Sequence, residues 1–173
     1  MCPKRLQSFA GSGHGQTQPD GGSLGRARIR SYHPTDKPAL LELLRLNTPA
    51  FFAPAEEADF IHYLSHEAAY YFVMEEAGQL LGCGGYNLLA EGTRAHISWD
   101  IFGPESQGKG LGTALTKFRI SEIKQHPEVQ TIVVRTTPQV CRFYEKSGFR
   151  TIKTVENYWA PGYDLVHMEM PAR

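Results

Sequence analysis

The chain has 173 residues, of which 41% are hydrophobic and 21% are charged, as is typical of a globular domain with a sizeable core. Eighteen basic residues balance eighteen acidic residues, which argues against broad electrostatic binding to nucleic acid or to an anionic membrane. No apolar run approaches the ~20 residues that a membrane helix needs. We therefore expect neither nucleic acid nor membrane as a partner.

The cysteines and histidines give no sign of a disulfide framework or a metal site. Cys2, Cys83 and Cys141 are odd in number and far apart, and they form no C-x-x-C pair. His62 and His66 have the spacing of two ligands on a helix, but no third ligand is evident, so we interpret them as a solvated face. We expect no metal, and free thiols in a reducing cytoplasm.

The first part of the chain differs in composition from the rest. Residues 1–25 are rich in glycine, with serine, glutamine and proline between the glycines, and they cannot bury enough apolar surface to offset the entropy of ordering. We interpret them as a disordered extension or leader, in preference to a functional arm. Residues 26–173 are predicted to form a single domain.

The first half of this domain indicates one strand, two helices and a hairpin. Residues 27–32 alternate weakly and indicate a strand. Thr35 is expected to cap a first helix, and a second helix is expected to begin near Glu56, where acidic side chains suit the helix dipole. Residues 70–75 and 80–89 are separated by a glycine turn and predict a β-hairpin.

The second half predicts a strand over residues 95–102, which Gly103-Pro104 ends because proline cannot donate to a ladder. The segments that follow are a helix over 111–124, a strand over 130–135, a helix that ends at Gly148, and strands over 151–157 and 163–170. This order, β-α-α-β-β-β-α-β-α-β-β, predicts an α/β (α+β) protein with a mixed central sheet of six to seven strands and helices on both faces.

A glycine-rich loop connects the strand over 95–102 to the helix that follows. Its sequence is Gln107-Gly108-Lys109-Gly110-Leu111-Gly112-Thr113. Glycine lets the backbone approach a ligand, and the first N–H groups of a helix have no internal partner, so the loop predicts a phosphate site. The glycine spacing fits neither a Walker loop nor a dinucleotide fingerprint.

Three motifs, taken together, resemble those of the GNAT acyltransferases, which use acetyl-coenzyme A. Gln107, Gly110 and Gly112 fit the family's pyrophosphate loop, Q-x-x-G-x-G. The strand stopped at Gly103-Pro104 resembles the family's fourth strand, whose break leaves backbone groups free for the pantetheine arm. The string Phe143-Tyr144-Glu145-Lys146-Ser147-Gly148-Phe149 resembles the family's F-Y-x-x-x-G-F signature.

The resemblance implies a GNAT fold and acetyl-CoA as the cosubstrate. By position it assigns coenzyme contacts to Ile101, Phe102, Gln107, Gly108, Lys109, Gly110, Leu111, Gly112, Thr113 and Thr137. Lys109 is either a phosphate contact or a solvated lysine. Thr137 departs from the asparagine that family members often carry there, and it offers one hydroxyl in place of an amide. The family also forms dimers frequently, so a homodimer is possible.

The resemblance also suggests groups for acid and base catalysis. Tyr144 is expected to be the general acid, since an ordinary tyrosine, with a pKa near ~10, is protonated at neutral pH; the alternative is an aromatic core residue. His96 stands where some members carry a glutamate base, and Asp100 is an alternative base or a group that binds a cationic acceptor; water could also take the proton. Strand alternation predicts that His96, Ser98, Asp100 and Phe102 share one face.

The acceptor is expected to enter opposite the coenzyme, between residues 47–54 and 158–163. Phe51, Phe52, Tyr158 and Trp159 would form an aromatic wall there, or else pack beneath a long loop. We therefore expect an N-acetyltransferase that acts on the primary amine of a small molecule by direct attack in a ternary complex. The alternatives are acetylation of a protein N-terminus or lysine, and a coenzyme-binding module without catalysis.

Overall fold

The computed structural model describes residues 27–89 and 91–173, so the predicted extension over residues 1–25 lies outside the described residues. The strands are β1 (Arg28–Ser31), β2 (Tyr70–Glu76), β3 (Gln79–Leu88), β4 (Arg94–Phe102), β5 (Thr131–Thr136), β6 (Arg150–Ala160) and β7 (Tyr163–Pro171). The helices are α1 (Lys37–Leu46), α2 (Glu56–His66), α3 (Leu111–Ile123) and α4 (Cys141–Glu145), with 3₁₀ turns η1 (Pro34–Asp36), η2 (Pro104–Ser106) and η3 (Pro138–Val140).

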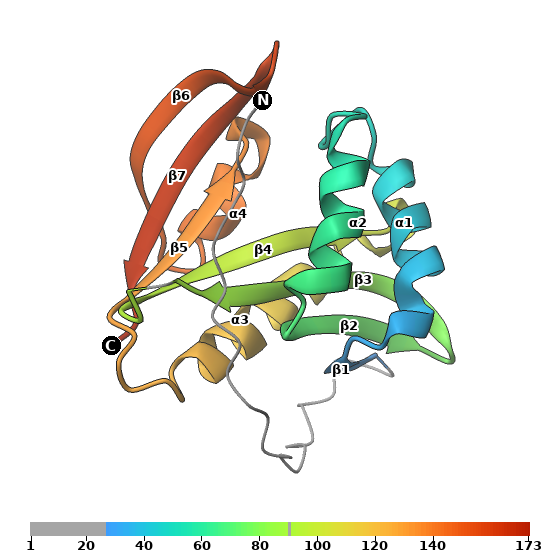
Figure 1. Cartoon of the computed structure of the whole chain (residues 1–173), viewed down its shortest axis with the longest axis horizontal. Helices are drawn as coiled ribbons and strands as arrows, with labels where there is room; N and C mark the ends of the chain where they lie inside the picture. Colours follow the sequence, from blue (N-terminus) through green and yellow to red (C-terminus); the bar gives the residue numbers. More distant parts are fainter. Residues whose placement is uncertain (1–26, 90) are drawn as a thin grey trace.

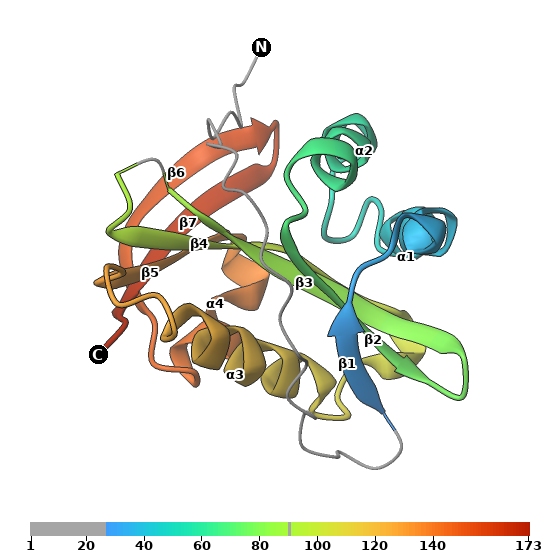
Figure 2. The same ribbon diagram turned by 60° about the horizontal axis from the view of Figure 1, so that its bottom comes forward.

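The strands form a seven-stranded sheet in the order β1-β2-β3-β4-β5-β7-β6. Helices α1 and α2 lie on one face of it, and α3 and α4 lie on the other (Figures 1 and 2). The mixed sheet with helices on both faces, and the order of elements, are confirmed. In the described part of the chain, no helix has the length and apolar character that crossing a membrane requires.

Each face of the sheet has its own hydrophobic core. The core on the α3 and α4 face includes Leu115, Ile123, Ile132, Val134 and Met168. The core on the α1 and α2 face includes Leu40, Leu44, Phe60, Tyr71 and Val73. Burial of apolar side chains on both faces makes the sheet a rigid support for the loops at its strand ends.

Strands β4 and β5 run parallel, but their pairing is short. It extends from Arg94↔Thr131 to Ile97↔Val134 and stops there. Strand β4 continues to Phe102, where it still pairs with Gly82 of β3. The two parallel strands therefore separate beyond Ile97, and the edge of β4 that faces β5 is left without a strand partner.

A β-bulge lies in β4 at the point where the strands separate. Cys83 of β3 pairs with Ile101, and Gly85 pairs with Ser98, so β4 holds one more residue than β3 between these pairs. Trp99 within this stretch has a φ of +52°, which L-residues seldom adopt. A bulge of this kind bends a strand and re-aims the side chains that follow it.

The bulge changes which side chains share a face. Ser98 Oγ donates a hydrogen bond of 2.6 Å to Asn87 Oδ1 on the face that α2 covers. Asp100 instead lies 2.6 Å from the Arg119 guanidinium of α3, on the opposite face. The prediction that the alternating residues between 96 and 102 share one face is therefore wrong, because the additional residue shifts the alternation by one.

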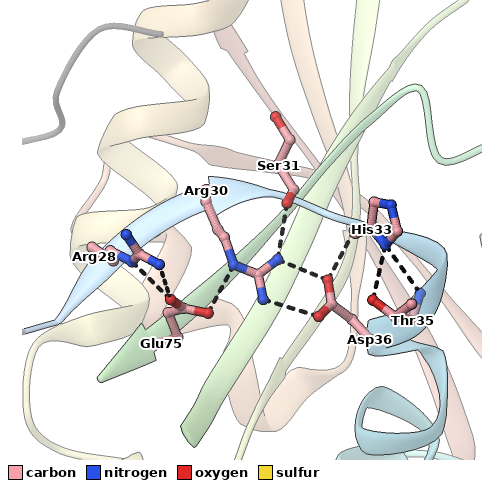
Figure 3. A network of polar contacts seen from close by, with 7 residues as sticks. All are labelled: Arg28, Arg30, Ser31, His33, Thr35, Asp36 and Glu75. Atoms are coloured by element: carbon pink, nitrogen blue, oxygen red, sulfur yellow. Dashed lines mark hydrogen bonds and ion pairs between the residues drawn. The ribbon is translucent and has the colours of Figure 1, made fainter. Parts of the chain in front are cut away.

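An ionic network anchors the edge strand β1 (Figure 3). Glu75 of β2 accepts hydrogen bonds of 2.7 Å from Nε of Arg28 and from Nε of Arg30. The Arg30 guanidinium also binds both carboxylate oxygens of Asp36, at 2.8 and 2.9 Å. Arg30 therefore connects the sheet to the turn that leads into α1.

The start of α1 differs from the sequence prediction. Thr35 lies inside η1, and the residue that caps this turn is His33, whose Nδ1 accepts from the Thr35 N–H. Asp36 completes the cap, since its carboxylate accepts the His33 N–H at 2.8 Å. Thr35 was a plausible cap by residue type, but the chain turns two residues earlier than the pattern predicts.

We predict that Arg30→Gln lowers the free energy of unfolding at pH 7 by about 1–3 kcal/mol, because two charged hydrogen-bond partners lose their donor. Arg28→Gln should cost less, since its side chain is 73% exposed. Hydrogen bonds from the arginines hold the pKa values of Asp36 and Glu75 below their usual range. The contribution is therefore present above about pH 4 and lost as the pH falls through the lowered values.

Urea unfolding of both variants and the wild type at neutral and acid pH measures this contribution. An Arg30→Gln deficit that is no larger than that of Arg28→Gln at neutral pH would contradict the role of Arg30.

Candidate active site

A cavity of about 770 Å³ lies at the separated ends of β4 and β5. The glycine loop and the start of α3 line it on one side, and the α1–α2 loop, α2, Trp159 of β6 and His167 of β7 line it on another. Most of the predicted catalytic and acceptor residues are among those that line it: Tyr144, His96, Asp100, Phe51, Phe52 and Trp159. Residues distant in the sequence thus meet in a single cavity.

Most of the predicted coenzyme contacts also line this cavity. They are Phe102, Gln107, Gly108, Gly110, Leu111, Gly112, Thr113 and Thr137. Ile101 and Lys109 do not: the Ile101 side chain is buried in the core beneath α1, and Lys109 is exposed. Any part that Ile101 has in coenzyme binding must therefore come from its backbone.

The glycine loop has the backbone conformation that an anion site requires. Gly108 and Gly110 have φ values of +75° and +79°, which favour glycine, and Gly110 immediately precedes α3. The first hydrogen bond of the helix runs from the Ala114 N–H to the Gly110 carbonyl at 3.0 Å. The N–H groups of residues 111–113 therefore precede the helical ladder and are available to a phosphate.

Asn47, which the sequence did not mark, connects three parts of the site. Its Nδ2 donates to the Leu43 carbonyl at 2.8 Å and to the Phe102 carbonyl at 3.0 Å. Its Oδ1 accepts from Gln107 Nε2 at 3.4 Å. Asn47 is buried, and it thereby fixes the end of α1, the end of β4 and the beginning of the glycine loop relative to one another.

The Phe102 carbonyl thus already accepts a hydrogen bond from Asn47. Of the two backbone groups of Phe102, the N–H is the one that remains available to the coenzyme. The Gly103 N–H donates to the Leu81 carbonyl of β3 at 3.0 Å. Because successive N–H groups along a strand point to opposite sides, the Phe102 N–H points away from β3, toward the gap between β4 and β5. This donor faces the place where the resemblance puts the thioester.

A buried ionic group lies beneath the bulge. Arg119 of α3 is completely buried, and its Nη1 lies 2.6 Å from Asp100 Oδ1. The same nitrogen donates to the Gly85 carbonyl at 3.1 Å, and Nη2 donates to Thr116 Oγ1 at 3.2 Å. These contacts compensate a charge that would otherwise be costly in the protein interior.

Tyr144 completes this group, because its hydroxyl donates a hydrogen bond to Asp100 Oδ2. Burial, followed by the negative charge of Asp100, raises the pKa of Tyr144 well above its usual value. The hydroxyl therefore stays protonated throughout the neutral range. Asp100 is held by both neighbours, so its contacts suit a carboxylate that orients Tyr144 better than one that accepts a proton from a substrate.

Gly84 provides the room for the Asp100–Arg119 pair. A Cβ atom on Gly84 would lie 2.3 Å from Asp100 Oδ1 and 2.8 Å from Arg119 Nη1. Real Cβ atoms do not approach other atoms so closely, so a side chain on this strand would displace the ion pair. Gly84 therefore belongs to the site, although no motif in the sequence identified it.

Aromatic residues form much of the acceptor side of the cavity. The Phe52 ring stacks on Trp99 with centroids 6.0 Å apart, and Trp99 also contacts Phe60 at 4.8 Å. Trp99 lies in the bulge, so sequence reasoning missed it as an acceptor-side residue. Tyr158 does not line the cavity, and its ring instead contacts the guanidinium of Arg135.

A hydrogen bond joins β7 to the α1–α2 loop beside a second, smaller hollow. Tyr163, at the start of β7, donates a hydrogen bond of 2.8 Å to the carbonyl of Pro49 in the α1–α2 loop. This contact joins the two segments that were predicted to line the acceptor entrance.

Comparison with known proteins agrees with this geometry. The family model of the acetyltransferase (GNAT) domain matches residues 47–172, so the chain belongs to this family. A curated relative, an N-alpha-acetyltransferase of Sulfurisphaera tokodaii, is 26% identical over 162 residues, which cover 83% of this chain and 92% of the relative. The chain is accordingly an acetyl-CoA-dependent N-acetyltransferase.

Solved structures share the fold. The ribosomal-protein-S18-alanine N-acetyltransferase from Escherichia coli has a TM-score of 0.70 at 22% identity, over 84% of this chain and 94% of that chain. The protein yncA from Salmonella typhimurium, solved with its cofactor acetyl-CoA, has a TM-score of 0.70 at 18% identity, over 86% and 95%. The predicted family and fold are confirmed.

We predict that Arg119→Met lowers the free energy of unfolding by about 3–5 kcal/mol, because it leaves the Asp100 charge in a buried site without its partner. The double variant Arg119→Met with Asp100→Asn should recover part of this loss, since no uncompensated charge remains. Urea unfolding measures both, with the exposed Arg142→Gln as a control. Equal losses in the single and double variants would contradict a buried ion pair.

Proposed function

We propose that the enzyme transfers the acetyl group of acetyl-CoA to the primary amine of a small molecule, by direct attack in a ternary complex. The observation that carries this proposal is the continuity of the cavity, which reaches from the glycine loop to the aromatic side without an intervening wall. Coenzyme and acceptor can therefore be bound at the same time, with the bulge of β4 between them.

The acceptor half of the cavity suits an amine with an apolar part. Phe52 and Trp99 offer a stacked aromatic surface, and the carboxylates of Glu56 and Glu67 stand on the α2 side. Negative charge and aromatic faces both attract an ammonium group. A small amine with an apolar group suits both features.

The residues of the cavity can be placed in a reaction sequence. The neutral amine attacks the thioester carbonyl carbon, and the Phe102 N–H stabilises the negative charge that develops on the oxygen. The carbon–sulfur bond then breaks, the amine nitrogen releases a proton, and the coenzyme thiolate takes one up. Tyr144 is the proposed donor to the thiolate: its one hydroxyl proton, held by Asp100 before the reaction, turns to the sulfur and passes to it, and the tyrosinate that is left recovers the proton that the amine releases.

The proton of the amine needs an acceptor. His96 lines the cavity on the α2 face of β4, which is the acceptor side, and it is our first choice as base, directly or through water. Asp100 lies on the other face and is bound to Arg119 and Tyr144, so we propose that it positions Tyr144. Location in the cytoplasm and a homodimer remain predictions from the sequence.

A second candidate acceptor is the α-amine at the N-terminus of a protein. It is favoured by the printed activity of the curated relative, an N-alpha-acetyltransferase. The two candidates differ in what lies beyond the amine, which is an apolar group of limited size in one and a peptide chain in the other.

Release of coenzyme A thiol from acetyl-CoA tests the proposal. The acceptor panel contains aryl and alkyl amines, polyamines, amino acids, aminoglycosides and short peptides with free N-termini. We expect the highest kcat/KM for a small amine with an aromatic or apolar group. Release only with peptides would favour the second candidate, and release with no amine at all would contradict the proposed reaction.

Tyr144→Phe should reduce kcat by about 100-fold or more, the usual contribution of a positioned general acid, and change the KM for acetyl-CoA far less. Tyr70→Phe on β2, remote from the cavity, is the matched control. Thermal unfolding of each variant separates loss of chemistry from loss of fold. If kcat is unchanged in folded Tyr144→Phe, this hydroxyl is not the acid.

A further inference from the structure

One cation in the cavity is held without a carboxylate. Arg135 of β5 lines the cavity, and among residues 27–89 and 91–173 no ion pair is formed by its guanidinium. The other arginine that lines the cavity, Arg94, is paired with Glu169 of β7. A half-buried guanidinium that faces a cavity without a counterion is a ready site for an anion.

Aromatic rings fix the orientation of this guanidinium. The Arg135 Cζ atom lies 4.8 Å from the ring centroid of Tyr158 and 5.1 Å from that of Trp159. These cation–π contacts restrict the side chain, and the guanidinium N–H groups that do not face the rings can make a bidentate contact. Because these contacts order the Arg135 side chain before a ligand binds, the binding of a carboxylate costs less side-chain conformational entropy.

The position of Arg135 relates this site to the reacting centre. Arg135 follows Val134, the last residue of β5 that pairs with β4, so it stands beside the point where the strands separate. Its neighbours Ile132 and Val134 face the α3 core, and alternation directs Arg135 to the opposite, acceptor face. Arg135 therefore lines the acceptor half of the cavity, next to the gap between the strands.

The opposite wall of the acceptor half carries negative charge. Glu56 is the first residue of α2, and Glu67 is the C-cap that follows its last turn. Both residues line the cavity. In Figure 1, the strands β5, β7 and β6 stand on the left and α2 stands on the right, and β4 runs across between their lower ends. The cavity therefore has carboxylates toward one side and the Arg135 guanidinium toward the other, an arrangement complementary to a molecule with separate positive and negative groups.

We propose that Arg135 binds a carboxylate of the acceptor, and that the acceptor is a small amino acid whose carboxylate lies a few bonds from the acetylated amine. This proposal rests on the proposed function and names its substrate class. The same carboxylate chemistry could come from an acidic side chain at the start of a peptide. We assign it to a small amino acid because Arg135 and the carboxylates of Glu56 and Glu67 line one cavity, which therefore accommodates both charges of the acceptor.

The first experiment compares kcat/KM for phenylalanine, phenylalanine amide and phenethylamine. The amide carries a neutral carboxamide in place of the carboxylate, and phenethylamine has neither group. We expect the amino acid to be preferred by about 10- to 100-fold, the value of one charged hydrogen-bonded contact. Arg135→Gln should reduce this preference toward one, whereas Arg150→Gln, exposed on β6, should retain it. Equal kcat/KM values for the acid and the amide in the wild type would overturn the proposal.

A binding measurement separates this proposal from the proposed reaction. Calorimetry of the coenzyme A complex with N-acetylphenylalanine and with its amide needs no turnover. Tighter binding of the acid, lost in Arg135→Gln, would support the subsite even if no amine were acetylated, and that result would overturn the proposed function alone. Equal binding of the two compounds would overturn the subsite.

Two further comparisons test whether the anion that Arg135 binds belongs to a small amino acid, to a peptide or to the coenzyme. Peptides that begin with Asp or Glu are compared with peptides that begin with Asn or Gln. A preference among peptides, without one among the small molecules, would overturn the assignment to a small amino acid. An increase in the KM for acetyl-CoA in Arg135→Gln, with the acceptor preference unchanged, would assign the cation to the coenzyme and overturn the proposal.

Discussion

The separation of β4 from β5 is the constraint on which the rest of the site depends. Two parallel strands that pair only as far as Ile97 and Val134 leave a backbone edge exposed within an otherwise continuous sheet. An exposed edge of this kind would be unfavourable in a buried strand, because its polar groups need partners. A ligand that runs between the strands can satisfy these groups. The glycine loop, the aromatic side and Tyr144 are all arranged around this opening.

Because of the bulge at Trp99, the side chains before and after it point to opposite faces of the sheet. Before the bulge, Ser98 contacts the polar groups beneath α2; after it, Asp100 contacts Arg119 and Tyr144 on the α3 side. A regular strand would place Asp100 on the acceptor face, away from Tyr144. The bulge therefore delivers the carboxylate to the proposed proton donor, and the same backbone irregularity places the Trp99 ring in the acceptor half.

Stability and proposed function are connected through buried charge. Removing Arg119 and Asp100 from water is costly, and a pair of apolar residues of similar size could often replace such a pair without loss of stability. The arrangement is explained by what it holds, since Asp100 binds the hydroxyl of Tyr144. Asn47 has a comparable role on the coenzyme side, where one buried amide connects α1, β4 and Gln107.

Much of the fold could be predicted because its signals are local. The hairpin turn, the glycine loop and the F-Y-x-x-x-G-F string each occupy a few consecutive residues, and they locate β2, β3, α3 and α4. The bulge has no such signal, since one additional residue in β4 is visible only against its partner strand. Arg119, Asn47 and Gly84 escaped prediction because their contacts join residues that are distant in the sequence.

A crystal structure of the enzyme with bound coenzyme A tests the central claim most directly. We expect the pantetheine arm between β4 and β5, the pyrophosphate against the N–H groups of residues 111–113, and the sulfur atom within hydrogen-bonding distance of the Tyr144 hydroxyl. A coenzyme bound elsewhere, or a sulfur atom beyond the reach of Tyr144, would contradict the account.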